Sequence, residues 1–594
     1  MSHPHYEPTT WSLADLYPAH DSAEVQQAIA DLEQRVEQFA AQRSLLTPTI
    51  SDDQFLQMLQ AIETIVGLLS RLSGYAGLAF STDTQNQQNQ IFMAQMQQKG
   101  AQIHNQILFF ELWWKQLGDE PAQRLLAVSG DNRYWLETLR LEKPHTLTEP
   151  EEKIINLKNV NGRRALMTLY ESITNRYSFS MSVNGESREL TRGELQVCFR
   201  DADPDLRAAA YQEFFRVYSG DATILGQIYQ YMVRDWRSEN VDLRAYSDPL
   251  AVRNLLNDMP DEVVQTLLAV CRQNAPLFHR YFRLKAQALG LEKLRRYDIY
   301  APISASEPSY PFAEGVRLTL ESLHRFDPQV ATLAQKILDE KHLDSEVRKG
   351  KRSGAFCATL APELTPWVLQ SYQGRTDDVT TLAHEIGHGI HALLAAEHSI
   401  LTQHASLPLA ETASTFSEML LVDRLLEIDP DPAVRRDLLF GQMDSAYATI
   451  MRQAFFAIFE QEAHALIHDG GSVETVSKLY LDNLREQFGD SLELSDDFRH
   501  EWVAIPHFYN SPFYVYAYSF GQLLVLSLYQ QFKQEGDAFK PRYMAILAAG
   551  GSDSPENILQ RAGIDIRAAA FWQGGFDVLA EMLAELEATS AAPA

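Results

Sequence analysis

The amino-acid sequence predicts a mainly α-helical protein with two lobes and a small β-ribbon. Apolar residues recur at the 3.6-residue helical period through most of the chain, whereas only one segment has a clear hairpin pattern. The chain has 594 residues, which is long enough to bury a large core and to form more than one lobe. Helices are therefore expected to supply most of the packing.

Helical patterns begin near the start of the chain. Ser51-Asp-Asp-Gln54 matches a capping box, and apolar residues at helical spacing follow it from Phe55 to Leu72. Residues 85–117 are rich in glutamine, but their apolar residues keep helical spacing, which predicts one long helix. Residues 205–240 and 248–290 have similar patterns.

The β signals are few. Residues 177–183 alternate in polarity, Asn184-Gly185 supplies a turn, and residues 186–190 return, which predicts a hairpin. A second strand-like region covers residues 354–360.

The composition argues against several classes of function. A formal net charge of −28 is unfavourable for a general nucleic-acid or membrane-surface binder. No apolar run reaches the ~18 residues that cross a membrane, and no signal peptide is visible. The three cysteines (Cys198, Cys271 and Cys357) are too scattered for a disulfide framework, so we expect a reducing, cytoplasmic compartment.

The clearest functional signal is the motif His384-Glu385-x-x-His388 in a predicted helix. Residues i and i+4 share a helical face, so both imidazoles can reach one tetrahedral zinc ion. Glu385 lies close enough to act on a metal-bound water. The alternative is a surface helix with two solvated histidines. It fits poorly, because the apolar residues around the motif indicate a buried helix, where His and Glu need partners.

Two other features of this helix carry expectations. Gly387 and Gly389 each lower helix stability by about 1 kcal/mol relative to alanine, so we expect another element to pass close to the backbone there. Asp378 precedes the motif. It either interacts with the helix N-terminus, which we favour, or hydrogen-bonds a ligand histidine.

A hydrolytic zinc site needs a third protein ligand. No cysteine pair is present, so the ligand must be a histidine or a carboxylate. His391 lies about 10 Å along the helix from the first ligand and is poorly placed. Leu394 excludes the metzincin pattern, while His398 and His404 stay as weaker candidates.

A carboxylate on a second predicted helix is the better third ligand. Glu411 lies at the start of the apolar segment 409–421, which would pack on the first helix. Glu418 lies two turns further along the same face, and spacing alone does not choose between the two.

An aromatic segment near the end of the chain supplies a further group of candidates. His507 is followed by Tyr509, Tyr514 and Tyr516. Core packing is the ordinary explanation for such a run. Buried tyrosine hydroxyls need partners, however, which favours a polar-lined cleft.

Several segments resemble one known family. Residues 384–391 and 410–416 look like the thimet oligopeptidase family of zinc metallopeptidases, specifically its bacterial oligoendopeptidase F branch. Residues 11–17, 297–302, 351–356 and 507–518 also match, so the resemblance covers nearly the whole chain.

The resemblance implies a zincin-like, two-lobed helical fold with a deep substrate channel. It implies zinc as the cofactor, with His384, His388 and Glu411 as ligands and Glu385 as the general base. It also implies that a late histidine and nearby tyrosines line the cleft. The late loop is shorter than in the thimet-type branch, so it stays open which of Tyr514 and Tyr516 donates a hydrogen bond to the oxyanion together with His507.

The motif predicts a zinc peptidase that acts by attack of a zinc-bound water, and the resemblance implies an endopeptidase that cuts internal bonds of short, unstructured oligopeptides. Gly354, Ala355 and Phe356 are expected to present a strand edge to the peptide, with Tyr509 as a further contact. The basic residues of segment 348–352 are interpreted as a solvated loop, and contact with a substrate carboxylate is the alternative. No nucleic-acid or membrane partner is expected, and the sequence does not indicate the oligomeric state.

Two rival functions remain. A zinc exopeptidase of the dicarboxypeptidase kind uses the same motif with a closed subsite for a peptide end. A non-catalytic peptide-binding protein is the other rival, and the intact Glu385 argues against it because a structural metal site needs no base.

We divide the chain into four parts. The predicted boundaries are an N-terminal helical lobe at 1–117, a connecting region with the hairpin at 118–200, a catalytic zinc peptidase domain at 201–585 and a frayed tail at 586–594.

Overall fold

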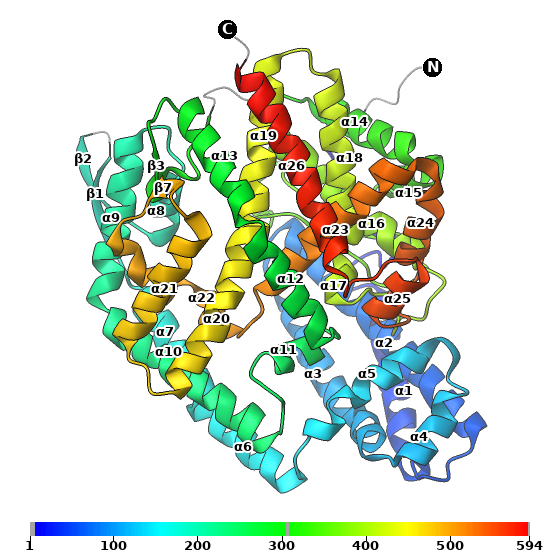
Figure 1. The fold of residues 1–594 in the computed structure, drawn as a ribbon. Coiled ribbons are helices and arrows are strands. Elements are labelled where there is room, and N and C mark those ends of the chain that lie inside the picture. Colours follow the sequence, from blue (N-terminus) through cyan, green and yellow to red (C-terminus); the bar gives the residue numbers. More distant parts are fainter. Residues whose placement is uncertain (1–5, 184, 304–307, 592–594) are drawn as a thin grey trace. The chain divides into compact units, whose positions relative to one another are not determined.

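A computed structural model of the chain describes residues 6–183, 185–303 and 308–591. Most of these residues are helical and the strands are short, which confirms the predicted mainly α fold (Figure 1). The chain divides into two compact units, and each unit is built from three separate segments. Unit 1 comprises Met1–Lys143, Glu307–Pro430 and Gln531–Asp565, and unit 2 comprises Pro144–Ser306, Asp431–Gln530 and Ile566–Ala594.

The first segment of unit 1 is a helical bundle. Its helices are α1 (Ala23–Ala41), α2 (Asp52–Thr82), α3 (Gln87–Gln116), α4 (Asp119–Leu126) and α5 (Arg133–Leu141). The hydroxyl of Ser51 accepts a hydrogen bond from the Gln54 N–H, so α2 begins where the capping pattern predicts. The glutamine-rich segment forms α3 as predicted, and the Trp114 ring of α3 lies 5.6 Å from the Phe55 ring of α2.

Among the helices of the described residues, α2 alone is long and apolar enough to cross a membrane by length and composition. Core helices of globular proteins pass the same test. Ten side chains of α2 are buried, and the helix packs against α1 and α3. These contacts are those of a core helix.

The rest of unit 1 surrounds one central helix, α16 (Thr376–Leu394). The other elements are α14 (Phe312–Phe326), α15 (Pro328–Asp339), β4 (Leu343–Asp344), β5 (Phe356–Ala358), β6 (Trp367–Leu369), α17 (Leu407–Ala410), α18 (Thr412–Ile428), α24 (Lys540–Ala548) and α25 (Pro555–Arg561). Helix α16 contacts α14, α15, α18, α24, β5 and β6. Helices from distant parts of the chain therefore hold it on several sides.

The small sheet of unit 1 has the strand order β4-β6-β5, with β4 parallel and β5 antiparallel to β6. The strand predicted at 354–360 is therefore present, although it is limited to the three residues of β5. Because β5 is at one end of this order, one of its edges is not paired within the sheet.

Unit 2 is also mainly helical. Its helices are α6 (Glu149–Asn161), α7 (Arg163–Thr174), α8 (Arg192–Cys198), α9 (Pro204–Gly220), α10 (Ala222–Arg237), α11 (Ala251–Leu256), α12 (Asp261–Gln273), α13 (Ala275–Ala288), α19 (Pro432–Ala446), α20 (Arg452–His468), α21 (Val473–Phe488), α22 (Pro506–Asn510), most of α23 (Tyr516–Glu535) and α26 (Ala569–Ala591). The segments 205–240 and 248–290 are thus largely helical, as their patterns predict.

The predicted hairpin of unit 2 is confirmed. Strands β1 (Phe179–Val183) and β2 (Glu186–Leu190) pair antiparallel, with Phe179 opposite Leu190. Gly185 has a φ of 83°, which suits a turn glycine, while Asn184 lies outside the described residues. A second pair, β3 (Leu294–Arg295) and β7 (Leu492–Glu493), is parallel.

The compact units do not follow the order of the sequence, whereas the four predicted parts are contiguous stretches. Helix α26 continues to Ala591, through most of the segment predicted as a frayed tail. Leu583 and Leu586 are fully buried, which explains why the helix continues. Residues 592–594 lie outside the described part of the chain.

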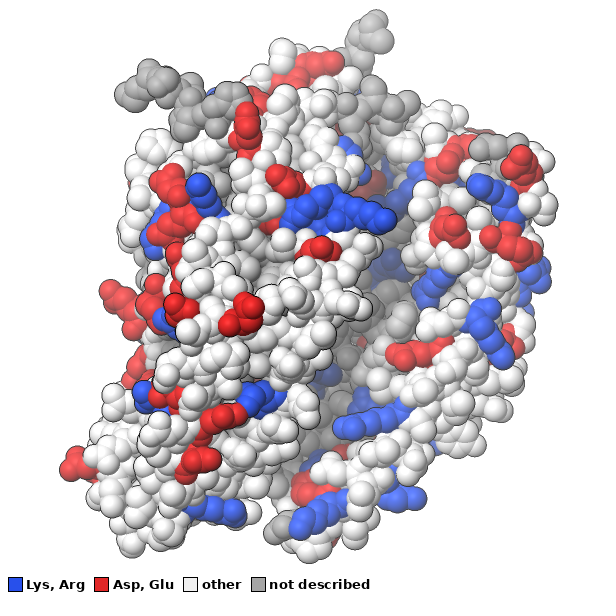
Figure 2. Space-filling model, turned by 180° about the vertical axis from the view of Figure 1, so that it is seen from behind, with Lys and Arg blue, Asp and Glu red and all other residues white. Residues whose placement is uncertain are grey.

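Charged side chains of both signs are interspersed over the face shown in Figure 2. The excess of 79 acidic over 51 basic residues is therefore not expressed on this face as one acidic patch.

Candidate metal centre and its surroundings

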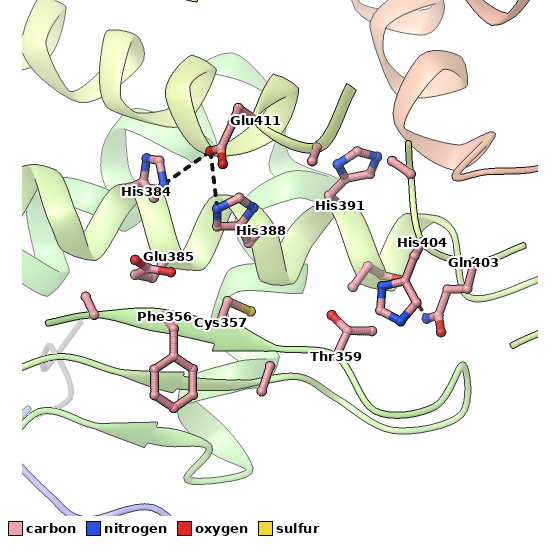
Figure 3. Close-up of a pocket in the computed structure, with 15 residues that line it drawn as sticks. Phe356, Cys357, Thr359, His384, Glu385, His388, His391, Gln403, His404 and Glu411 are labelled. Atoms are coloured by element: carbon pink, nitrogen blue, oxygen red, sulfur yellow. Dashed lines mark hydrogen bonds and ion pairs between the residues drawn. The ribbon is translucent and has the colours of Figure 1, made fainter. Parts of the chain in front are cut away.

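Two histidines of α16 and one carboxylate converge on a single point (Figure 3). The Oε2 atom of Glu411 lies 3.3 Å from Nε2 of His384 and 3.4 Å from Nε2 of His388. Each of the three residues offers a ligand atom within 4.8 Å of the others. Two ligands bound at 2.0–2.2 Å to a tetrahedral zinc ion lie about 3.4 Å apart, so this donor set fits zinc.

Glu418 has a different position from Glu411, the other carboxylate that spacing left as a possible ligand. Its Oε1 atom lies 2.5 Å from Nδ1 of His384, on the side of the ring away from Glu411. A carboxylate there fixes the tautomer, because Nδ1 keeps its proton and Nε2 presents its lone pair to a metal. This geometry favours Glu411 as a candidate ligand and Glu418 as a group that orients His384.

Gly387 brings the ligand helices together. A Cβ at this position would lie 2.6 Å from the Ser414 Cα and 2.7 Å from the Ala413 carbonyl oxygen. The close approach predicted from the glycine is therefore present, and the approaching element is the start of α18, directly after Glu411. At Gly389 a Cβ would lie 2.5 Å from Cδ1 of Ile337, which is the end of a flexible side chain rather than backbone.

The start of α16 is held by Asp378. Its Oδ2 atom accepts hydrogen bonds of 2.9 Å from the backbone N–H groups of Gln373 and Arg375. Of the two predicted roles for Asp378, the structure thus supports the interaction at the helix N-terminus.

The carboxylates give the site a negative charge. Burial lowers the pKa of His384, but the hydrogen bond to Glu418 and the nearby carboxylates outweigh it and raise this pKa to about 9. Burial lowers the pKa of His388, against the charge of Glu411. Three carboxylates beside two imidazoles leave the site with an excess of negative charge, which suits a divalent cation.

Glu385 lies below His384 and His388 in Figure 3, between α16 and β5. Burial raises its pKa to about 7, while the His384 imidazole lowers the pKa and Glu411 raises it. A carboxyl group with a pKa near neutrality can accept and release a proton at ordinary pH.

A cavity of about 580 Å³ opens at these residues. Of the predicted strand-edge residues, Ala355 and Phe356 line it and Gly354 is not among its lining residues. The full lining is Ala355, Phe356, Cys357, Ala358, Thr359, His384, Glu385, His388, His391, Ala392, Gln403, His404, Ala405, Ala410 and Glu411. Strand β5 and helix α16 thus form opposite walls (Figure 3).

The other candidate histidines do not join the metal-ligand cluster of the described residues. His391 and His404 line the cavity. His398 is held by Asp131 at 2.7 Å and by the Ala548 carbonyl at 2.9 Å, which indicates a structural role. In the basic segment 348–352, Arg348 and Lys351 pair with the buried Asp344, so these two residues are structural rather than solvated.

In unit 2, His507 and two tyrosines form a group at the surface. The His507 ring lies 6.1 Å from the Tyr514 ring and 6.0 Å from the Tyr518 ring, and the two tyrosine rings are 5.4 Å apart. His507 and Tyr518 are exposed and Tyr514 is partly exposed. Tyr518 is not among the predicted site residues, although it lies one helical turn from Tyr514.

Tyr516 and Tyr509 lie in the core of unit 2. Tyr516 is 1% exposed, and its hydroxyl accepts a 2.8 Å hydrogen bond from the Asn257 amide. Tyr509 is fully buried, donates to the Leu225 carbonyl and stacks on Tyr170 at 3.8 Å. Both hydroxyls have partners inside the protein, so these placements do not support direct contact of either residue with substrate.

Hydrogen bonds to Glu460 and Arg253 hold the loop between His507 and α23. Phe513 has a φ of 59°, which is strained for a large side chain. Its N–H donates a 3.0 Å hydrogen bond to Glu460, and the neighbouring Pro512 carbonyl accepts one from Arg253. Burial raises the pKa of Glu460 to about 8, although the Phe513 N–H and Arg253 lower it.

A helical scaffold that carries a His-Glu-x-x-His helix, with a carboxylate placed as a candidate third ligand beside the two histidines, is typical of a metallopeptidase. A model described as peptidase family M3 matches residues 197–578, and a model described as oligopeptidase F matches residues 113–179. The chain belongs to peptidase family M3.

Relatives along most of the chain agree with this assignment. The chain is 29% identical over 517 residues to the group B oligopeptidase PepB of Streptococcus agalactiae, which covers 85% of both proteins. It is 29% identical to the chromosomal oligoendopeptidase F of Lactococcus lactis, over 70% of each. The predicted resemblance to the oligoendopeptidase F branch, and with it the prediction of a metalloendopeptidase, is confirmed.

Solved structures show the same fold. The crystal structure of a Chlamydophila abortus protein has a TM-score of 0.88 at 24% identity and covers 98% of both chains. The oligoendopeptidase F of Enterococcus faecium has a TM-score of 0.69, also at 24% identity, and covers 96% of this chain and 99% of its own.

Proposed function

We propose that this protein is a zinc-dependent endopeptidase that hydrolyses internal bonds of short, unstructured oligopeptides in the cytoplasm. The observation that carries the proposal is the spacing of the His384, His388 and Glu411 donor atoms, which matches one tetrahedral ion. The printed names of the relatives support the choice of oligopeptides as substrates.

Zinc is the metal that this donor set favours. Two imidazoles and one carboxylate leave a fourth position open, as in catalytic zinc sites. When bound, the ion would polarise the scissile carbonyl and lower the pKa of water. The Glu418 carboxylate holds His384 in the tautomer that such binding requires.

Glu385 is the proposed general base. Its carboxylate takes a proton from the attacking water and passes it to the leaving amine as the peptide bond breaks. Burial has already brought its pKa to about 7, so both protonation states are accessible during one turnover. Its position between α16 and β5 leaves it on the cavity wall.

The substrate backbone is proposed to add along β5. Residues of this strand line the cavity, and one of its edges is unpaired within the sheet, so main-chain hydrogen bonds there would bind peptides with little dependence on sequence. His507 and Tyr514 are proposed as hydrogen-bond donors to the developing oxyanion, a role that typically contributes 100-fold or more to turnover. Tyr516, which bonds to Asn257, is assigned a supporting position behind them.

The decisive experiment uses an internally quenched peptide of about ten residues, blocked at both ends. Wild type and Glu385→Gln are compared at equal zinc content. We expect internal cleavage by wild type only. Cleavage that appears only on free-ended peptides would move the assignment to an exopeptidase, and turnover by zinc-loaded Glu385→Gln would rule out the assigned base.

A further inference from the structure

A second cavity, of about 520 Å³, lies within unit 2 beside His507. Its lining is charged, since it includes three arginines, and Glu501 is its one acidic lining residue. Its walls are Arg192, Gln196, Phe199, Arg200, Tyr211, Phe214, Tyr300, Ala448, Arg452, Gln453, Phe456, Glu501, Ala504, Ile505, Pro506 and His507.

The carboxylate of Glu501 already has hydrogen-bond partners that do not line the cavity. Its Oε1 atom accepts a 3.1 Å hydrogen bond from the buried Arg296, and its Oε2 atom accepts one of 2.7 Å from Tyr480. Arg452 reaches the same carboxylate only at 3.8 Å. The single acidic group of the lining is therefore balanced by Arg296, which is itself 2% exposed.

Arg452 has hydrogen-bonding capacity to spare. Its Nη1 atom is 3.4 Å from the Tyr300 hydroxyl, a long contact, and its side chain is 29% exposed. A guanidinium group that lines a cavity and has only long contacts to its neighbours can still bind an anionic ligand. The arginine follows directly on a π-helical turn, Tyr447–Met451, a local distortion that is frequent at functional sites.

The other two arginines differ in availability. Arg192 is occupied by the Tyr218 hydroxyl at 3.0 Å and the Ala504 carbonyl at 2.9 Å. Arg200 is exposed, and its guanidinium lies 5.5 Å from the centre of the Tyr300 ring. Arg452 and Arg200 thus both lie close to Tyr300, and both arginines line the cavity.

We propose that this cavity binds a carboxylate of the peptide substrate, held by Arg452 and Arg200 beside His507. Planar guanidinium groups match carboxylate geometry, and a cationic cavity in a chain of net charge −28 attracts acidic rather than basic peptides. The carboxylate is supplied either by the C-terminus of the peptide or by an aspartate or glutamate side chain. This inference rests on the proposed peptidase function.

The test compares matched peptide pairs. One pair differs only in a C-terminal carboxylate or amide, and the other, blocked at both ends, differs only in glutamate or glutamine at one position. For wild type we expect kcat/KM to be about 10-fold higher for the acidic member of one pair. That pair identifies the source of the carboxylate, and no preference in either pair would overturn the proposal.

Three variants locate the preference. In Arg452→Gln and Arg200→Gln the ratio of kcat/KM between the acidic and neutral peptides should fall toward one. Arg188→Gln removes the same charge from an exposed position on β2, outside the cavity, and should keep the wild-type ratio. A ratio that persists in both cavity variants, or that falls equally in Arg188→Gln, contradicts the proposal. If Arg452→Gln does not fold, Arg200→Gln decides alone.

A binding measurement separates this inference from the catalytic one. The Kd values of the same peptide pairs for Glu385→Gln are measured by fluorescence anisotropy, with and without Arg200→Gln. If wild type cleaves no peptide, the proposed function fails, and the ratio of Kd values still reports on the carboxylate site. A Kd ratio that does not respond to Arg200→Gln overturns the site even when peptides are cleaved.

Discussion

The backbone of Ser414 occupies the space that a side chain at Gly387 would need, since a Cβ there would lie 2.6 Å from the Ser414 Cα. Gly387 lies on α16 with His384 and His388, and Ser414 lies on α18, which begins directly after Glu411. Helix packing at this contact therefore sets how near Glu411 comes to both histidines.

We expect Gly387→Ala to weaken metal binding and to destabilise unit 1. The added methyl group would press on the α18 backbone at Ser414, and overpacking of this kind lowers the free energy of unfolding by about 1–3 kcal/mol. Metal content after dialysis and the thermal unfolding midpoint measure both effects. Gly77→Ala is the control, because a Cβ at Gly77 in α2 meets nothing within 4 Å. Wild-type metal affinity in Gly387→Ala would show that the contact does not position the ligands.

Glu418→Gln should lower zinc affinity about 10–100-fold while the protein stays folded. The amide cannot accept the Nδ1 proton of His384 as strongly as the carboxylate does, so the ligand tautomer is less well fixed. Competition with a zinc-binding dye gives the affinity. Glu427→Gln, at the exposed end of the same helix, should leave it unchanged. Equal affinities in Glu418→Gln and wild type would assign Glu418 no role at the metal.

The two late tyrosines should respond differently to loss of the hydroxyl. Tyr514→Phe is expected to lower kcat about 100-fold with little change in stability. Tyr516→Phe leaves the Asn257 amide without a partner inside the protein, which costs about 1–3 kcal/mol of unfolding free energy. Steady-state kinetics and urea unfolding of both variants distinguish the roles. If Tyr516→Phe lost activity and Tyr514→Phe lost stability instead, the two roles would be exchanged.

The buried carboxyl of Glu460 should make the stability depend on pH. Its folded-state pKa of about 8 is above the ordinary 4.5, so the folded protein holds a proton that the unfolded chain releases between these values. The contribution of Glu460 to the free energy of unfolding is therefore complete below about pH 4.5. It is lost as the pH rises toward 8, by about 1.4 kcal/mol per unit of pKa difference.

Glu460→Gln tests this sign. Glutamine keeps an acceptor for the Phe513 N–H but does not ionise. The difference in urea midpoint between the variant and wild type should favour the variant increasingly from pH 5 to pH 8. A constant difference across this range would mean that Glu460 is ionised in the folded protein.

Much of the site could be predicted because its chemistry is local in the sequence. His384, Glu385 and His388 share one helix, and their spacing alone brings the imidazoles together. The choice of Glu411 over Glu418 depends on how α18 crosses α16, which the contact at Gly387 determines and periodicity does not reveal. Burial of Tyr509 and Tyr516 likewise depends on partners, Leu225 and Asn257, that are more than 250 residues away.

The arginine cavity is harder still to find in the sequence. Arg200, Tyr300, Arg452 and His507 are separated by tens of residues or more, and each alone has an ordinary explanation as a surface or core residue. The compact units show the same limit. Each is assembled from three segments, so no boundary in composition marks them.

The hydroxyl of Tyr543 in α24 donates a 3.1 Å hydrogen bond to the carbonyl of Thr412, the residue after Glu411. Synthesis runs from the N-terminus, so α24 leaves the ribosome more than a hundred residues after the ligands that it braces. A nascent chain therefore contains His384, His388 and Glu411 long before this hydrogen bond to Thr412 can form. The order of translation therefore separates the synthesis of these three side chains from the synthesis of the helix that braces them.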